Sequence, residues 1–127
     1  MSLSVVIPSY KSAATLPRAI RSCLPWIAAR DIHVVLDGPD EALEKAASAF
    51  EGVCVMVRAE RSGAPACRNA GLARVTSDYT MFLDADDYVE GPMLRDVPRV
   101  GRAASADLVI GRFDFEWPSG ARERRDP

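Results

Sequence analysis

Three carboxylates stand close together in the sequence, directly after an apolar run. Asp84, Asp86 and Asp87 follow the mostly apolar segment Tyr79–Leu83. An apolar run of this length, bounded by polar residues, is typical of a strand buried on both faces of a parallel sheet. Ligands of such sheets bind beyond the carboxyl ends of the strands. Neighbouring carboxylates repel one another unless a cation lies between them, and oxygen ligands suit Mg²⁺, Mn²⁺ or Ca²⁺. The motif therefore predicts a metal site; the alternative is a polar loop that only caps the strand.

Composition limits the class of protein. The chain has 127 residues, enough for one domain with its own core, so we expect a single domain over residues 1–127. A hydrophobic content of 48% and a formal net charge of −2 indicate a globular protein and give no reason to expect a nucleic-acid partner. No apolar run has the length of a transmembrane segment, and no signal peptide is visible. We therefore expect a cytoplasmic protein, either free or peripheral at the inner face of the membrane.

The cysteines and the histidine exclude several kinds of site. Cys23, Cys54 and Cys67 are odd in number and widely spaced, without a CxxC pair, so neither a zinc site nor a disulfide framework is indicated. His33 is the single histidine and lies in an apolar run, where a strand residue is expected. A single histidine excludes any HExxH site, which needs two, and a single histidine in an apolar run gives no reason to expect a Ser-His-Asp triad.

Apolar runs and helical periodicities alternate along the chain. The predicted strands cover residues 3–7, 32–36, 53–57, 79–83 and 107–110, and the predicted helices cover 12–28, 40–50, 63–75 and, interrupted by Pro98 and Gly101, a short stretch from Pro92. Beyond them Phe113, Phe115 and Trp117 alternate with charged residues, which is typical of an edge strand. We expect the basic tail 122–125 to be solvated. The order predicts an α/β fold with an open, mostly parallel sheet, helices on both faces and an edge strand near the C-terminus. Asp37 and Asp84 each follow a strand and should share one rim.

Four segments in the right order resemble the nucleotide-sugar-binding part of family 2 glycosyltransferases, which have the GT-A fold. They are Val5–Tyr10, Val34–Gly38, Gly63 with Cys67–Leu72, and Tyr79–Asp87, the last carrying the DXD motif. The resemblance runs from about Ser4 to Ile110. It implies transfer of a sugar, with inversion, from a nucleoside-diphosphate sugar to an acceptor hydroxyl. It also implies a Mn²⁺ or Mg²⁺ cofactor and, as first choice of donor, a UDP-sugar.

The resemblance implies roles for the acidic residues. Asp86 is the expected metal ligand, and Asp84 is expected to contact the ribose, or the metal through water. Asp87 either assists or faces solvent. Arg68 is expected to support the diphosphate or Asp84, with a solvated helix residue as the equal alternative.

The resemblance also implies a pocket for the base. Asp37 matches the aspartate that accepts a hydrogen bond from the ring NH of uracil. Tyr10 is expected to stack on or flank the base, and Pro8 and Ser9 to shape the same pocket through their backbone.

Some positions depart from the family pattern. Leu36 replaces an acidic residue, Lys11 replaces an asparagine, and Arg61-Ser62-Gly63 replaces Asn-x-Gly. If Lys11 and Arg61 point into the pocket, they favour a diphosphate.

The catalytic base stays unknown, because in the family it lies further along the chain than the segment matched here. Asp114 and Glu116 are the late carboxylates on the alternating stretch, and neither is assigned as the base. The acceptor-binding half is therefore expected to be short or absent. Two alternatives remain open: a nucleotide-sugar-binding module without turnover, and a DxDx[TV] phosphohydrolase, in which Tyr88 would stand at the Thr/Val position.

Overall fold

The computed structural model describes residues 2–126 and contains six strands and four α-helices in that range. In chain order the elements are β1 (Leu3–Ser9), α1 (Leu16–Cys23), the 3₁₀ turn η1 (Ala29–Asp31), β2 (Ile32–Leu36), α2 (Glu41–Ser48), β3 (Cys54–Val57), α3 (Ala64–Leu72), β4 (Tyr79–Phe82), α4 (Met93–Ala103), β5 (Phe113–Glu116) and β6 (Arg122–Arg125). Within the described range no helix has the length and apolar character needed to cross a membrane.

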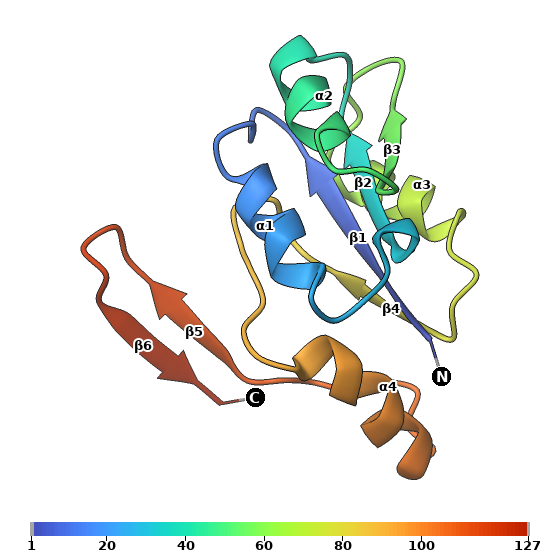
Figure 1. The fold of residues 1–127 in the computed structure, drawn as a ribbon, viewed down its shortest axis with the longest axis vertical. Coiled ribbons are helices and arrows are strands. Elements are labelled where there is room, and N and C mark those ends of the chain that lie inside the picture. Colours follow the sequence, from blue (N-terminus) through green and yellow to red (C-terminus); the bar gives the residue numbers. More distant parts are fainter. Residues whose placement is uncertain (1, 127) are drawn as a thin grey trace.

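The first four strands form one parallel sheet in the order β3-β2-β1-β4 (Figure 1). Ile7 of β1 pairs with Val34 of β2, and on its other side β1 places Val5 opposite Met81 of β4. Helical crossovers connect these strands, because a hairpin cannot join parallel neighbours. The predicted α/β class and parallel sheet are confirmed.

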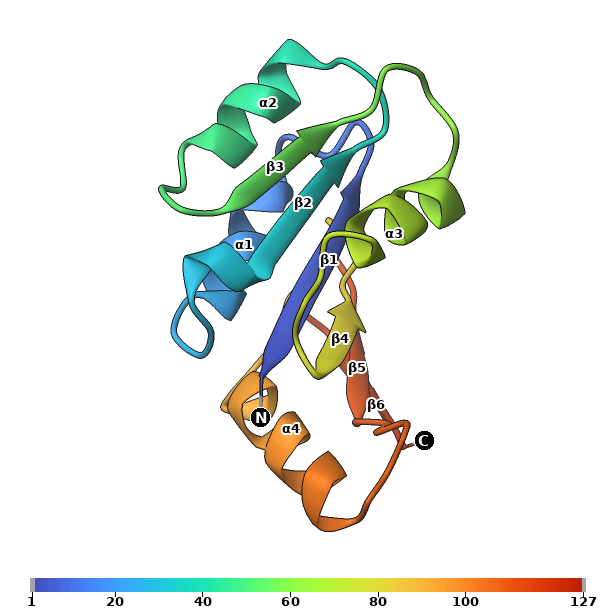
Figure 2. The same cartoon turned by 90° about the vertical axis from the view of Figure 1, so that its right-hand side faces the viewer.

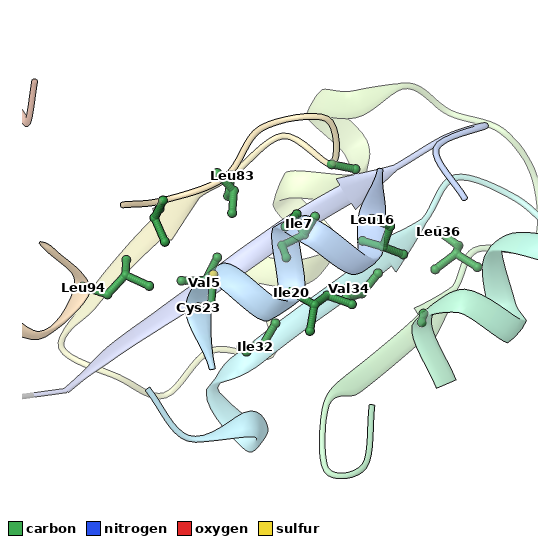
Figure 3. Packing of buried hydrophobic residues seen from close by; sticks show 14 of the residues in the cluster. Val5, Ile7, Leu16, Ile20, Cys23, Ile32, Val34, Leu36, Leu83 and Leu94 are labelled. Carbon is green, nitrogen blue, oxygen red and sulfur yellow. The ribbon is translucent and has the colours of Figure 1, made fainter. Parts of the chain in front are cut away.

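Helices cover both faces of this sheet (Figure 2). Val5 and Ile7 point to the face covered by α1, where they pack with Leu16 and Ile20 (Figure 3). Val6 points the other way, into a second cluster beneath α3. Successive side chains of a strand alternate between faces, so a strand covered on both sides must be apolar at almost every position. β1 meets this condition, since all seven of its residues are buried.

The first helix is shorter than the predicted span of residues 12–28. α1 begins at Leu16 and ends at Cys23. Pro17 fits only the first turn of a helix, which fixes the start, and Pro25 has no N–H to continue the hydrogen-bond ladder, which fixes the end. The apolar periodicity is real over α1, while the flanking residues form turns. The predicted third helix is also too long, since α3 ends at Leu72.

The predicted interruption of the fourth helix is wrong. α4 continues through Pro98 as one helix of 11 residues. Leu94, Pro98 and Gly101 form its buried side, and a Cβ atom on Gly101 would lie 2.7 Å from the hydroxyl oxygen of Tyr79. Proline costs the helix one hydrogen bond, and the burial of this side against the sheet offsets that loss.

The strand before the three carboxylates is not buried on both faces. β4 pairs only with β1 among the described residues, so it lies at the edge of the sheet, and Phe82 is 43% exposed. The apolar character of a strand does not reveal how many neighbours it has, because burial also depends on segments distant in sequence.

The C-terminal region also differs from the prediction. Residues 107–110 form no strand, and the alternating segment does not join the main sheet. Instead β5 and β6 pair with each other as an antiparallel hairpin (Figure 1). The basic tail is therefore the second strand of this hairpin, where Arg124 faces Asp114 and Arg122 faces Glu116. Opposite charges in these cross-strand positions favour the pairing.

Candidate functional site

A pocket lies at the carboxyl ends of β1, β2 and β4, and we call it the rim pocket. Its volume is about 480 Å³. It is lined by Pro8, Ser9, Tyr10, Lys11, Ser12, Thr15, Asp37, Ala64, Cys67, Arg68, Asp84, Ala85 and Asp86. The backbone N–H of Asp37 donates to the carbonyl oxygen of Ser9 at 2.9 Å, which ties the ends of two strands together at this rim. The volume lies in the range of small-molecule sites.

All seven residues that the sequence predicts for nucleotide-sugar binding line this pocket. Asp37 and Asp84 lie on the same rim because parallel strands end on the same side of a sheet. Lys11, Ser12, Thr15 and Cys67 also line the pocket; the first was considered only as a side chain that favours a diphosphate if it points into the pocket, and the other three were not predicted as site residues. The loop after β1 carries the first three of them, and any loop at the carboxyl end of a parallel strand is a reasonable place to search.

The acidic loop, Asp84–Asp87, presents its carboxylates to the outside of the fold. Leu83 and Ala85 are buried and anchor the segment, so the aspartates between and after them point outward. One oxygen from each of Asp84, Asp86 and Asp87 lies within 4.8 Å of the others. Burial and the nearby carboxylates of Asp86 and Asp84 raise the pKa of Asp87, while Arg18 opposes this shift. A cluster with this charge and spacing offers the oxygen ligands that a hard divalent cation needs.

Arg68 of α3 contacts the acidic loop from the opposite wall of the pocket. Its Nη2 atom lies 3.1 Å from Oδ1 of Asp84, and the two side chains are 35% and 55% exposed. An ion pair this exposed adds little to stability. The pair holds the carboxylate of Asp84 in place, and it puts the positive charge of the Arg68 guanidinium in the wall of the pocket.

Asp37 joins the end of β2 to the start of α3. Its carboxylate accepts hydrogen bonds from the backbone N–H groups of Ser62 at 2.7 Å and Gly63 at 3.0 Å. The bond from Ser62 is the main cause that holds the pKa of Asp37 below its ordinary value. Gly63 has φ of +92°, a conformation that favours glycine. The base-contacting role of Asp37 stays a prediction.

Tyr10 and Lys11, which follow β1, are part of the pocket lining. The guanidinium of Arg61 lies 4.0 Å from the centre of the Tyr10 ring, within range of a cation–π interaction. Lys11 lines the pocket, whereas Arg61 stacks on the tyrosine and is not part of the lining. Lys11 also has φ of +49°, in the left-handed region. Asparagine tolerates this region better than lysine, which gives a physical reason for the asparagine of the family pattern.

Arg18 and Ser22 of α1 contact the segment that contains the acidic loop. Arg18 Nη2 donates to the backbone carbonyl oxygen of Asp86 at 2.8 Å, and its guanidinium lies 4.6 Å from the centre of the Tyr88 ring. The hydroxyl oxygen of Ser22 accepts from the N–H of Val89 at 3.1 Å. The sequence places both residues on the polar face of the helix. The signal in the sequence for a shared contact was their i, i+4 spacing, because it puts both side chains on one side of α1.

The hairpin reaches the same segment through a cluster of polar side chains. The hydroxyl of Tyr88 donates to Glu116, and Arg122 Nη2 lies 2.9 Å from both Glu116 Oε2 and Glu90 Oε1. The hydrogen bond from Tyr88, together with Arg122, holds the pKa of Glu116 below its ordinary value. A carboxylate in this position is a weak proton acceptor.

A second hollow, of about 520 Å³, lies on α4. It is lined by Arg95, Pro98, Arg99, Arg102 and Ala103 and contains none of the predicted site residues. Asp96 forms ion pairs with Arg95 and Arg99. His33 is a half-buried residue of β2, which confirms the predicted strand position, and it does not line either pocket.

The amino-acid sequence and the fold match known glycosyltransferases. The family model of Glycosyl transferase family 2 matches residues 4–126. Glycosyltransferase AglE of Haloferax volcanii is 26% identical, over 98% of this chain and 44% of its own length. The structure of Staphylococcus aureus TarS, residues 1–349, has a TM-score of 0.72 at 22% identity, over 81% of this chain and 33% of that one. The structure of mannosyltransferase PcManGT of Pyrobaculum calidifontis, solved with GDP-Man and Mn²⁺, has a TM-score of 0.61 at 20% identity. The similarity covers 92% of this chain and 36% of that one.

The chain thus spans less than half the length of each of these relatives. The match nevertheless covers all four segments that carry the resemblance, and the TM-scores show that both structural neighbours share the fold. The DxDx[TV] alternative is set aside by this match. The chain belongs to glycosyl transferase family 2 and has the GT-A fold.

Proposed function

We propose that the rim pocket binds a nucleoside-diphosphate sugar and that the protein transfers the sugar to an acceptor hydroxyl with inversion, in a reaction that requires a divalent cation. The observation that carries this proposal is the position of the acidic loop and Arg68 on two walls of one pocket. Family membership supports sugar transfer, and the GDP-Man and Mn²⁺ of PcManGT support a nucleotide sugar and a metal.

The residues present fit a divalent cation. Three exposed carboxylates with oxygens inside 4.8 Å form a hard, oxygen-only set that suits Mn²⁺ or Mg²⁺. Asp86 would bind the cation directly and Asp84 would act through water or on the ribose. A cation held here would supply positive charge to the diphosphate as it leaves.

The side chains of the chain itself would orient the donor. Arg68 is placed to contact the diphosphate while it holds Asp84. Asp37 and Tyr10 line the same pocket, where they would contact the base, and Pro8 and Ser9 would shape it through their backbone. A uridine nucleotide is the first donor to test, because Asp37 matches the family's uracil-contacting aspartate. A location at the inner face of the membrane stays our prediction.

A second candidate function is nucleotide-sugar binding without transfer. Inversion by direct displacement needs a base that removes the proton of the acceptor. Of the late carboxylates, Glu116 is bonded to Tyr88 and Arg122, and Asp114 is paired with Arg124. Neither lines the rim pocket, which favours a donor-binding module if no other base is supplied.

Titration calorimetry with UDP, with and without Mn²⁺, tests the proposal. Asp86→Ala is expected to abolish the Mn²⁺-dependent part of UDP binding, because it removes the main ligand. Asp107→Ala is the control, since it removes an exposed carboxylate outside the pocket. Equal UDP affinity for the Asp86 variant and the wild type would overturn the metal assignment.

Release of UDP from UDP-sugars in the presence of Mn²⁺ separates the two functions. Turnover is expected if the chain transfers or hydrolyses the donor. Calorimetric binding without any turnover would leave the binding module as the function of this chain.

A further inference from the structure

We propose that Arg18 is a positioning residue for the acidic loop: it sets the spacing of the three carboxylates and thereby the affinity of the loop for a divalent cation. The inference rests on the proposed function for its metal part. It assigns a role to a residue of α1 that does not line the rim pocket.

Arg18 contacts the loop at its backbone. The hydrogen bond from Nη2 to the carbonyl oxygen of Asp86, at 2.8 Å, fixes the peptide unit that directly follows the expected metal ligand. The orientation of that peptide sets the direction in which the side chains of Asp86 and Asp87 leave the backbone. Groups that orient metal ligands in this way contribute strongly to metal affinity.

The same guanidinium also contacts the residue after the loop. It lies over the ring of Tyr88, with 4.6 Å from the guanidinium carbon to the ring centre. The contact with the ring and the hydrogen bond together restrict the guanidinium to one orientation, which an ammonium group, a charged donor without the planar fork, reproduces only in part. Arg18 therefore bridges Asp86 and Tyr88 across the turn that carries the carboxylates.

One turn further along α1, Ser22 adds a second attachment. Its hydroxyl oxygen accepts from the N–H of Val89, which is buried. Residues 18 and 22 lie on one side of the helix, so α1 acts as a rigid edge along residues 86–89. The buried Leu16 and Ile20 fix α1 to the sheet. The carboxylates are therefore held in a fixed position relative to the hydrophobic core.

Arg21 provides a matched control for the charge. It lies on the same helix, is exposed, and has its guanidinium over Phe50 at 5.5 Å, outside the acidic segment. Arg18→Ala and Arg21→Ala remove the same charge and the same length of side chain. A difference between them therefore reports the location of Arg18 beside the acidic loop, that is its contacts and its local charge, and not the net charge of the protein. Loss of a nearby positive charge by itself would strengthen the binding of a cation, so weaker binding by Arg18→Ala reports the lost contacts.

The first measurement is the affinity for Mn²⁺, determined by electron paramagnetic resonance on the full chain without nucleotide. Arg18→Ala is expected to weaken Mn²⁺ binding about tenfold with little change in melting temperature, since an outer partner of a metal ligand is lost while the core is intact. Arg21→Ala should bind Mn²⁺ as the wild type does, and Arg18→Lys, which keeps a charged donor, should bind more tightly than Arg18→Ala. Equal weakening by Arg18→Ala and Arg21→Ala, or no difference between the Lys and Ala variants, would overturn the role.

The second measurement is hydrogen exchange of the amides in residues 84–90 without metal. Faster exchange in Arg18→Ala, and not in Arg21→Ala, is expected if Arg18 holds the loop. Unchanged exchange overturns the positioning role even when Mn²⁺ binds. A wild-type protein that binds no Mn²⁺ instead overturns the metal part of the proposed function, and the exchange data still decide the role of Arg18.

Discussion

The guanidinium of Arg68 and the carboxylate of Asp84 lie 3.1 Å apart across the rim pocket. Both side chains are substantially exposed, so the pair adds at most about 1 kcal/mol to stability. We therefore expect Arg68→Ala to leave the melting temperature nearly unchanged. The same variant should weaken Mn²⁺-dependent UDP binding about tenfold, because Asp84 and the diphosphate both lose their contact with the guanidinium. Arg74→Ala, an exposed arginine after α3, is the control for calorimetry. Equal loss of affinity in both variants would contradict the local role.

The close approach of α3 to β1 gives a prediction about packing. A Cβ atom on Gly71 would collide with Cγ1 of Val6 and lie 3.2 Å from Cγ2 of Val35. Overpacking of this kind costs about 1–3 kcal/mol, against about 1 kcal/mol gained from helix propensity. Gly71→Ala should therefore lower the free energy of unfolding by up to about 2 kcal/mol in urea titrations. In a Val6→Ala background the same substitution should cost less, and strict additivity would contradict the proposed collision.

Lys11 occupies a strained backbone conformation. Its φ of +49° lies in the left-handed region, which costs a lysine roughly 1–2 kcal/mol and an asparagine less. Lys11→Asn should raise the free energy of unfolding by about 0.5–1 kcal/mol. Because Lys11 also lines the pocket, UDP affinity should fall.

A substitution at Ser105 serves as a control that distinguishes relief of backbone strain from loss of a side chain in the pocket. It has φ of +51° and lies outside the pocket, so Ser105→Asn should stabilise the protein and leave UDP binding unchanged. A destabilised Lys11→Asn variant would contradict the assignment of strain.

Asp37 should contribute to the acid sensitivity of the fold. Its pKa in the folded protein lies below the ordinary value of 3.8, because Ser62 and Gly63 donate to the carboxylate. A lowered folded pKa gives stability that is complete above the unfolded pKa and is lost as the pH falls through the folded value. Asp37→Asn should be less stable at neutral pH and should lose less stability between about pH 5 and pH 2. Chemical denaturation at several pH values measures this, and parallel curves for variant and wild type would contradict it.

Much of the pocket was predictable because its residues are local to strand ends. An apolar run of four or five residues predicts a strand, and the polar residue that follows it must leave the sheet at the rim. This reasoning places Asp37 and Asp84 on one rim before any coordinates are known. The resemblance then adds Arg68, Tyr10, Pro8 and Ser9, and the structure brings all of them into one lining.

Features that depend on distant segments were not predictable. The edge position of β4 follows from its pairing with β1 alone among the described residues. The continuity of α4 through Pro98 depends on its burial, and the separate hairpin depends on cross-strand charge pairs. Local sequence carries propensity and periodicity, whereas the number of neighbours of an element is set by the whole chain.

The acidic loop itself shows where the two kinds of information meet. The sequence by itself determined that three carboxylates follow a strand, because that needs only residue type and order. The tertiary structure alone decided that Arg18 bonds to the carbonyl of Asp86 and that Tyr88 meets Glu116, since the helix, the loop and the hairpin that supply them are far apart in the chain. Contacts of this kind form only when packing of the core has fixed the elements that carry them.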